Sequence, residues 1–248
     1  MIKHVEIENV KGFILRGYLH LPKNAKKIVV MYHGFTGNKT EHNGHFRNLS
    51  RLLYKEGIAS IRLDYHGNGE SDGEFSDFTF IDAYDDAKRI LEYARNIKGI
   101  EKVAILGFSF GGGLAGLIAN DENCDQLVLI SAAANMPELA EKKFATWRKL
   151  ENGNYYSSGF ELSQYFADGL LGRDMYENTQ NFTKEVLVIQ ARDDLAVPYM
   201  FGVKYAVSYK NARLHIVKNS GHGYDSLENA QELYSETVKF LNKNLKKR

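Results

Sequence analysis

The sequence predicts an α/β fold built on a mostly parallel, eight-stranded sheet that is flanked by helices. Continuous apolar runs, each typical of a strand buried on both faces, alternate with stretches of helical period. Two segments that alternate apolar and polar residues precede them, as half-exposed antiparallel strands do. A chain of 248 residues is long enough for one such domain, in which folding buries about three quarters of the unfolded surface.

The expected elements alternate regularly along the chain. Residues 4–9 and 13–21 form the antiparallel pair, and the buried strands that follow are 27–34, 58–65, 102–109, 126–133, 185–192 and 212–219. The clearest helix covers residues 79–98, where Thr79 and Asp82 are placed as a capping box before an apolar stripe. The last helix covers residues 225–245. Repeated strand and helix after an antiparallel pair favour an open α/β sheet.

The composition excludes several classes of partner. Lys plus Arg total 32 against 31 Asp plus Glu, so no charge field points to nucleic acid. No segment approaches the roughly 18 apolar residues of a membrane span, and charges interrupt the N-terminal segment where a signal peptide is apolar. The single cysteine, Cys124, fits a reducing compartment. We therefore expect a cytoplasmic protein with a small-molecule substrate; whether it forms a homodimer stays open.

One connection is far longer than an ordinary helical crossover. Residues 134–184 separate two buried strands and are rich in aromatic residues, including the only tryptophan, Trp147. We interpret this segment as a lid inserted after the sixth strand, over the carboxyl edge of the sheet, so that residues 1–133 and 185–248 form the core. Alternatively, most of these aromatic side chains form only the small core of the segment itself, since buried aromatics mostly serve packing.

The motif G-x-S-x-G occurs where a buried strand passes directly into a helix. It reads Gly107-Phe108-Ser109-Phe110-Gly111. In such a turn the serine takes a strained backbone conformation that exposes its hydroxyl. Side chains at the two glycine positions would collide with the neighbouring strand and helix. Ser109 is therefore a candidate nucleophile. The alternative, a serine that only caps the helix, does not need this glycine pattern.

A serine nucleophile needs a base, and the base needs an orienting carboxylate. With a nucleophile in such a turn, the expected order along the chain is serine, acid, histidine. Two adjacent candidates for the acid, Asp193 and Asp194, follow strand 185–192. His222 lies in a glycine-flanked loop after the last strand, at the same edge of the sheet as Ser109. We expect His222 to be the base.

The other histidines fit this role less well. His66 lies in a loop after a strand but precedes the serine in the chain, so we interpret it as structural. The remaining ones lie on the leading strands, on a predicted helix or within a strand, away from the site or as surface and packing residues: His4, His20, His42, His45 and His215.

The developing oxyanion of an acyl-transfer reaction needs two N–H donors. One is expected from the residue after the nucleophile, Phe110. The second is expected from the loop after the first parallel strand, which reads His33-Gly34-Phe35 and supplies the backbone N–H of Phe35. We interpret His33 as a residue that braces this loop by hydrogen bonds.

With these residues the chain resembles the α/β-hydrolase superfamily over nearly its full length, and within it most closely the small bacterial feruloyl (cinnamoyl) esterases. The resemblance is carried by "HGFTGN", "IASIRLDYHGNGESDGEF", "GFSFGG", "DDLAVP" and the His222 loop. The acid loop of such proteins commonly reads G-x-x-D-x-x-V-P, which favours Asp194 and leaves Asp193 as the competitor. Those relatives often have G-H-S-Q-G at the motif and usually glycine in place of Ala191. Phe108 and Phe110 therefore alter the wall beside the serine.

The resemblance implies a serine carboxylic ester hydrolase that cleaves feruloyl or coumaroyl esters through an acyl-enzyme on Ser109, without metal or cofactor. The same residues would serve a monoacylglycerol lipase, a short-chain carboxylesterase, a thioesterase or an acyltransferase. A serine peptidase is another alternative. A non-catalytic binding protein of this fold is the last one, although it should have lost a triad position, and all three are occupied here.

Overall fold

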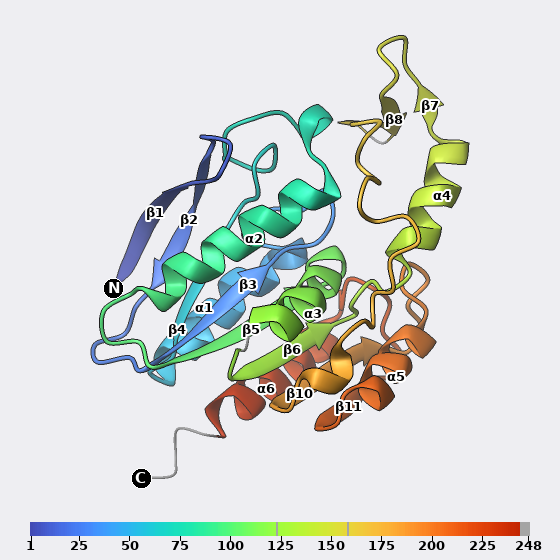
Figure 1. The fold of residues 1–248 in the computed structure, drawn as a ribbon. Coiled ribbons are helices and arrows are strands. Elements are labelled where there is room, and N and C mark those ends of the chain that lie inside the picture. The colour runs from blue at the N-terminus through green and yellow to red at the C-terminus, as the bar shows by residue number, and fades with distance from the viewer. Residues whose placement is uncertain (123, 158, 244–248) are drawn as a thin grey trace.

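The computed structural model describes residues 1–122, 124–157 and 159–243. Its centre is an eight-stranded sheet whose strands lie in the order β1-β2-β4-β3-β5-β6-β10-β11 (Figure 1). The strands of this sheet are β1 (Ile2–Glu8), β2 (Ile14–His20), β3 (Lys27–Tyr32), β4 (Ala59–Leu63), β5 (Lys102–Phe108), β6 (Gln126–Ile130), β10 (Glu185–Ala191) and β11 (Ala212–Val217). β2 is antiparallel to both its neighbours, and all other pairs are parallel. The predicted sheet is confirmed.

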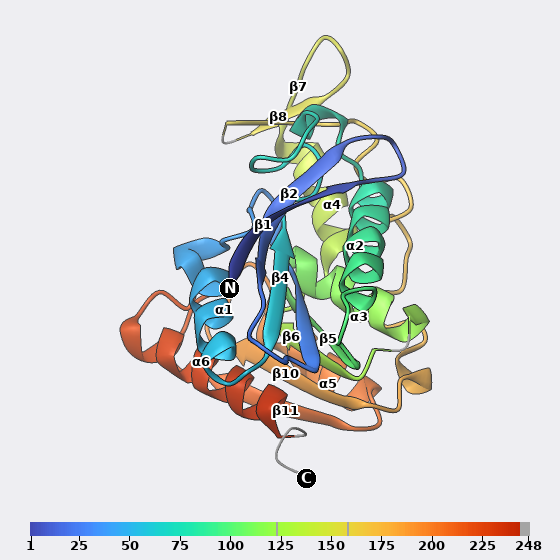
Figure 2. The same cartoon turned by 90° about the vertical axis from the view of Figure 1, so that its left-hand side faces the viewer.

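Helices cover both faces of the sheet, which explains the continuous apolar strands. The helices are α1 (His45–Lys55), α2 (Phe80–Arg95), α3 (Phe110–Glu122), α5 (Tyr199–Ser208) and α6 (Leu227–Asn242). Figure 2 shows α1 and α6 on one face and α2 and α3 on the other. Within β3, Val29 is buried in the cluster that includes α1 and α6, and Val30 in the cluster with α2 and α3. Both faces of each central strand are therefore apolar. None of the described helices is long and apolar enough to cross a membrane.

The two predicted helices begin and end slightly differently from the expectation. Thr79 caps α2, since its hydroxyl accepts from Asp82 N at 3.2 Å, but the Asp82 carboxylate accepts from the Thr79 hydroxyl at 2.8 Å rather than from its backbone N–H as in a capping box. α2 ends at Arg95 rather than residue 98, since Asn96 is its C-cap, with a ψ of 0°. α6 begins at Leu227 rather than residue 225, because Ser226 is its N-cap. Predicted positions 244 and 245 lie outside the described residues.

Residues 134–184, here called the insertion, connect β6 to β10. Their elements are α4 (Met136–Thr146), β7 (Arg148–Lys149), β8 (Tyr155–Ser157), β9 (Phe160–Leu162) and the short helix η3 (Thr179–Asn181). The three strands form a separate antiparallel sheet, and the described part of the insertion adds no strand to the main sheet. In both views α4 and this small sheet stand beyond the carboxyl ends of the parallel strands (Figures 1 and 2).

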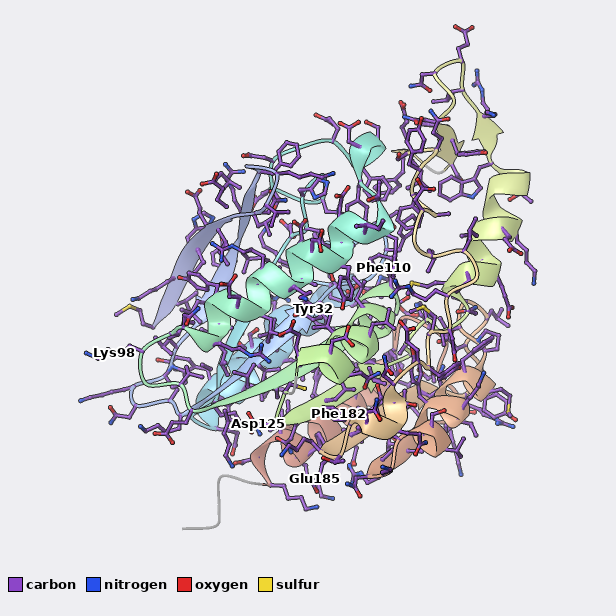
Figure 3. All side chains as sticks on the ribbon, in the orientation of Figure 1. Tyr32, Lys98, Phe110, Asp125, Phe182 and Glu185 are labelled. Carbon is purple, nitrogen blue, oxygen red and sulfur yellow. The ribbon has the colours of Figure 1, made fainter. Side chains whose placement is uncertain are left out.

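The predicted site residues all lie at the carboxyl ends of the parallel strands. Asp125 and Glu185 lie at the amino ends of β6 and β10, whereas Phe110 lies at the opposite, carboxyl end of β5 (Figure 3). Ser109, Asp194 and His222 follow β5, β10 and β11. Because these strands are parallel, the three loops lie at the same end of the strands.

A lysine is buried at the amino end of β3. Lys27 is only 1 % exposed, and its Nζ donates to Gln126 Oε1 and to the carbonyl oxygen of Leu241. Burial lowers the pKa of Lys27 to about 8, because removal from water disfavours the charged form. Both acceptors are uncharged, so they compensate this cost only in part.

We predict that the stability of the protein depends on pH through Lys27. Between pH 8 and 10.5 the unfolded chain holds this proton and the folded chain releases it, so stability rises with pH. Relative to Lys27→Met, the wild-type free energy of unfolding should gain up to about 3 kcal/mol between pH 7 and 10. Urea denaturation across this range measures the difference. Lys26→Met, at an exposed neighbour, is the control, and parallel curves for the wild type and Lys27→Met would contradict the prediction.

Candidate active site

Ser109 occupies the sharp turn between β5 and α3. Its φ is +52°, a conformation that is strained for a residue with a side chain. A Cβ at Gly107 would lie 2.1 Å from the carbonyl oxygen of Gly111, and one at Gly111 would lie 2.0 Å from that of Tyr32. The predicted crowding at both glycines is thus confirmed. The backbone of Ser109 is held from outside the turn as well, because Ser109 N donates to Ile130 O at 2.9 Å.

The structure brings together Ser109, His222 and Asp194. His222 Nε2 lies 2.9 Å from Ser109 Oγ, and His222 Nδ1 lies 2.7 Å from Asp194 Oδ2. Neutral His222 with its proton on Nδ1 can donate to Asp194 and accept from Ser109. Asp193, the alternative acid, is exposed, and its backbone N–H donates to Ser220 O instead. Of the two aspartates, only Asp194 is within hydrogen-bond distance of His222.

The Asp194 carboxylate is buried and surrounded by donors. Its Oδ1 accepts from Val197 N at 2.7 Å and from Ala196 N at 3.0 Å, and its Oδ2 accepts from Gln190 Nε2 at 3.3 Å. These bonds stabilise a charge that burial alone would disfavour. Gln190 was not identified from the sequence. It is a polar residue that directly follows the apolar run 186–189, and this position could have marked it.

The two predicted oxyanion donors come from different loops next to Ser109. Phe110 begins α3, so its N–H is one of the first four, which have no acceptor within the helix. Phe35 lies in the loop after β3 and lines two cavities together with Ser109. The role of these two N–H groups remains a prediction.

The histidines near the site have distinct surroundings. His33 Nδ1 lies 2.9 Å from the Gly34 carbonyl oxygen, which agrees with a bracing role, and burial lowers the pKa of its imidazole. His66 is buried against Asp86, with Nδ1 2.8 Å from Oδ2, as a structural residue would be. The sequence predicts a surface or packing role for His45, yet its Nε2 lies 2.7 Å from the carbonyl oxygen of Gly223, beside His222.

Two chambers meet at Ser109 and His222. The apolar chamber has a volume of about 250 Å³ and is lined mainly by hydrophobic side chains from the core and the insertion. They include Phe35, Phe110, Met136, Ala140, Trp147 and Phe166. The polar chamber, of about 600 Å³, is lined by Thr36, Asn38, Glu41, His42 and Asp225 among others. Among the described residues, no Lys or Arg lines either chamber.

The insertion contacts both predicted oxyanion residues through Phe166. The Phe166 ring centroid lies 5.0 Å from that of Phe35 and 6.1 Å from that of Phe110. The rings of Phe35 and Phe110 lie 5.9 Å apart. The three rings therefore form one aromatic cluster at the wall of the apolar chamber.

In the described part of the chain, no three His, Cys, Asp or Glu side chains are grouped so as to hold a metal ion.

Two family models match the chain. The model described as serine aminopeptidase, S33, matches residues 23–157, and the model described as TAP-like protein matches residues 172–243. Among characterised relatives, the lysophosphatidylserine lipase ABHD12 of Danio rerio is 26% identical over 192 residues, which are 73% of this chain and 47% of that protein. Protein YfhR of Salmonella typhimurium, whose function is uncharacterised, is 22% identical over 222 residues, 86% of this chain and 70% of that protein. The chain thus spans about half the length of the lipase it matches.

Solved structures of esterases share the fold. Est1E from Butyrivibrio proteoclasticus with bound ferulic acid has a TM-score of 0.86 and 25% identity, covering 98% of this chain and 100% of that chain. The Pyrococcus furiosus esterase Pf2001 has a TM-score of 0.72 and 19% identity, covering 98% of this chain and 92% of that chain. The second likeness concerns the fold alone.

The two aspartates of the acid loop make a matched pair for a test of the site. Asp194→Asn leaves His222 without a carboxylate partner and favours the wrong tautomer, so reaction of Ser109 with a fluorophosphonate should slow by about 10³–10⁴. Asp193→Asn should stay within about twofold of the wild type, because the Asp193 side chain does not contact His222. The rate of covalent labelling, followed by mass spectrometry, measures both. Equal labelling of the two variants would contradict the assignment.

Proposed function

The chain belongs to the α/β-hydrolases matched by the serine aminopeptidase S33 model, and on this premise we propose that it hydrolyses hydroxycinnamate esters through an acyl-enzyme on Ser109. The observation that carries the proposal is the hydrogen-bonded series Ser109–His222–Asp194, of which Ser109 and His222 line the apolar chamber. Membership of a hydrolase family and the likeness to an esterase with ferulic acid bound support the same class of reaction.

The proposed reaction proceeds in two halves. His222 Nε2 takes the Ser109 proton as Oγ attacks the ester carbonyl, while Asp194 stabilises the imidazolium that forms. The N–H groups of Phe35 and Phe110 stabilise the oxyanion. His222 then returns the proton to the leaving alcohol, and the acyl-enzyme remains on Ser109. A water molecule repeats the same steps and releases the acid.

The apolar chamber favours a compact, planar acyl group. Its volume of about 250 Å³ lies just below the range of roughly 300–1,000 Å³ that is typical of ligand sites. Aromatic walls suit an aromatic acyl group, and so limited a volume argues against the long chain of a monoacylglycerol. In this proposal the insertion is a lid, since Trp147 and Phe166 form part of the chamber wall.

The polar chamber is the proposed site of the leaving alcohol. Its lining of Thr36, Asn38 and Asp225 offers hydrogen-bond partners to hydroxyl groups. No described Lys or Arg lines it to bind the phosphate of a lysophospholipid head group, and the carboxylates of Glu41 and Asp225 would repel that phosphate. The charges of this chamber thus favour a neutral alcohol.

A short-chain carboxylesterase is the second candidate, and the small apolar chamber also supports it. The lining of the apolar chamber also disfavours an aminopeptidase. The acyl part of an aminopeptidase substrate carries a free ammonium group, which needs a carboxylate nearby. No described Asp or Glu lines the apolar chamber.

The proposed function predicts a specific pattern of substrates. Methyl ferulate should be hydrolysed with a higher kcat/KM than long-chain aliphatic p-nitrophenyl esters, a monoacylglycerol or an aminoacyl anilide, because it fits the apolar chamber. Ser109→Ala should lose at least about 10⁴-fold in kcat. Initial rates across the panel measure this. A preference for short aliphatic esters would replace the feruloyl assignment by the carboxylesterase, and full activity of Ser109→Ala would end both.

Ala140 on α4 tests whether the apolar chamber takes the acyl group. Ala140→Leu adds bulk inside a chamber of about 250 Å³. It should lower kcat/KM for methyl ferulate by about tenfold or more and spare p-nitrophenyl acetate. Ala140→Ser, which adds little volume, is the control. Equal losses on both esters would show that the aromatic acyl group does not enter this chamber.

A further inference from the structure

The loop that carries Phe35 is unusually strained. Within residues 34–44, Thr36, Glu41 and Asn43 all have positive φ, at 58°, 60° and 52°. Glu41 combines its φ with a ψ of 165°, a region that is occupied almost only by glycine. Such conformations persist only where the surrounding structure enforces them, and they concentrate at functional sites. The strain at Glu41 therefore calls for a group that holds it.

The Glu41 carboxylate supplies that restraint. The residue is only 8 % exposed, and its carboxylate accepts two backbone hydrogen bonds. Gly34 N donates to Oε2 at 2.6 Å, and His42 N donates to Oε1 at 2.8 Å. Burial raises the pKa of Glu41, and these two N–H donors oppose that change. A buried carboxylate is thus used to hold backbone of its own loop rather than to bind a Lys or Arg.

The bond from Gly34 N bears directly on Phe35. The Gly34 carbonyl and the Phe35 N–H belong to one planar peptide unit and point in opposite directions. The Gly34 carbonyl oxygen accepts from Gly37 N at 3.1 Å and lies 2.9 Å from His33 Nδ1. On the other side of Gly34, its backbone N–H donates to the Glu41 carboxylate. Together these bonds remove the rotations about Gly34 that would turn the Phe35 N–H.

Gly34 needs this restraint because glycine is the most flexible residue. A Cβ placed there would meet nothing closer than 3.4 Å, which is ordinary contact, and it would lie 3.5 Å from Ser109 Cβ. Crowding therefore does not hold Gly34 in place, although it adjoins the nucleophile. Its conformation depends on its hydrogen bonds.

We infer that Glu41 is a positioning residue for the oxyanion hole, which holds the Phe35 N–H toward Ser109 through its bond to Gly34. This inference rests on the proposed function. Glu41 acts through the backbone, so its loss should lower kcat and leave KM for a small methyl ester nearly unchanged. It should also weaken the binding of tetrahedral adducts, whose oxygen occupies the oxyanion hole.

The pair Glu41→Gly and Glu41→Ala separates this role from a structural one. Both variants lack the carboxylate, and both should lose about tenfold to a hundredfold in kcat for methyl ferulate, with KM within about twofold. Glycine adopts the backbone conformation of Glu41 without strain, whereas alanine does not. Glu41→Gly should therefore melt about 2–4 °C above Glu41→Ala while being equally slow.

Inhibition by an aryl boronic acid gives a second readout. Its inhibition constant should rise by the same factor as kcat falls, because both depend on the oxyanion hole. Active sites are counted by fluorophosphonate labelling at completion, so that unfolded enzyme does not count as slow enzyme. Glu56→Ala, which removes an acidic residue beyond the far end of α1, should match the wild type in kcat. Glu41→Gln keeps an oxygen for Gly34 N–H and should be faster than Glu41→Ala.

The inference is overturned if Glu41→Gly keeps the wild-type kcat per active site, or if the loss falls on KM alone. It is also overturned if Glu41→Gln is as slow as Glu41→Ala, since charge rather than the hydrogen bond would then matter. Ser109→Ala in the same assay distinguishes a failure of the proposed function from a failure of the role inferred for Glu41. Full turnover by Ser109→Ala would refute the proposed function, whereas an inactive Ser109→Ala beside a normal Glu41→Gly would refute only the role of Glu41.

Discussion

The close approach of α3 to the sheet is the constraint on which the rest of the site depends. The backbone at Gly107 and Gly111 leaves no room for a Cβ. Between these two glycines the chain passes from β5 into α3 through a turn in which Ser109 has a φ of +52°. That turn fixes the direction of the Ser109 hydroxyl and the position of the first N–H of the helix at the same time. A displaced helix would move both, so Ser109, the predicted nucleophile, and one predicted oxyanion donor depend on the same packing.

The strained turn is complemented by restraint from the neighbouring loops. Asp194 is fixed by two backbone N–H groups and by Gln190, so the imidazole of His222 meets an acceptor that is already oriented. Glu41 holds the loop after β3 in a similar way. In both cases a buried carboxylate binds backbone N–H groups, which move little during a reaction. Such fixed dipoles need no reorganisation when charge develops, which is the physical basis of electrostatic stabilisation in enzymes.

Periodicity and motif spacing in the sequence were sufficient to predict the main sheet and the three residues that meet at the candidate site. Alternating apolar and polar residues predicted the first two strands of the main sheet, and continuous apolar runs predicted the other six. The loops after three of these strands predicted that Ser109, Asp194 and His222 would meet. The supporting residues escaped this reasoning. Glu41 and His45 reach the site through bonds between a side chain and the backbone of an irregular loop. The shape of such a loop has no period in the sequence, and Glu41 adopts a conformation that local preferences disfavour.

The aromatic cluster of Phe35, Phe110 and Phe166 links parts of the molecule that serve different purposes. Phe166 belongs to the insertion, whereas the other two residues belong to loops of the core. An evolutionary or engineered exchange of the insertion would therefore change the packing against both core loops. In the proposed mechanism the insertion forms part of the wall around the acyl group, and the two core loops supply the oxyanion donors. A change of the insertion is therefore expected to alter the choice of substrate and the rate together.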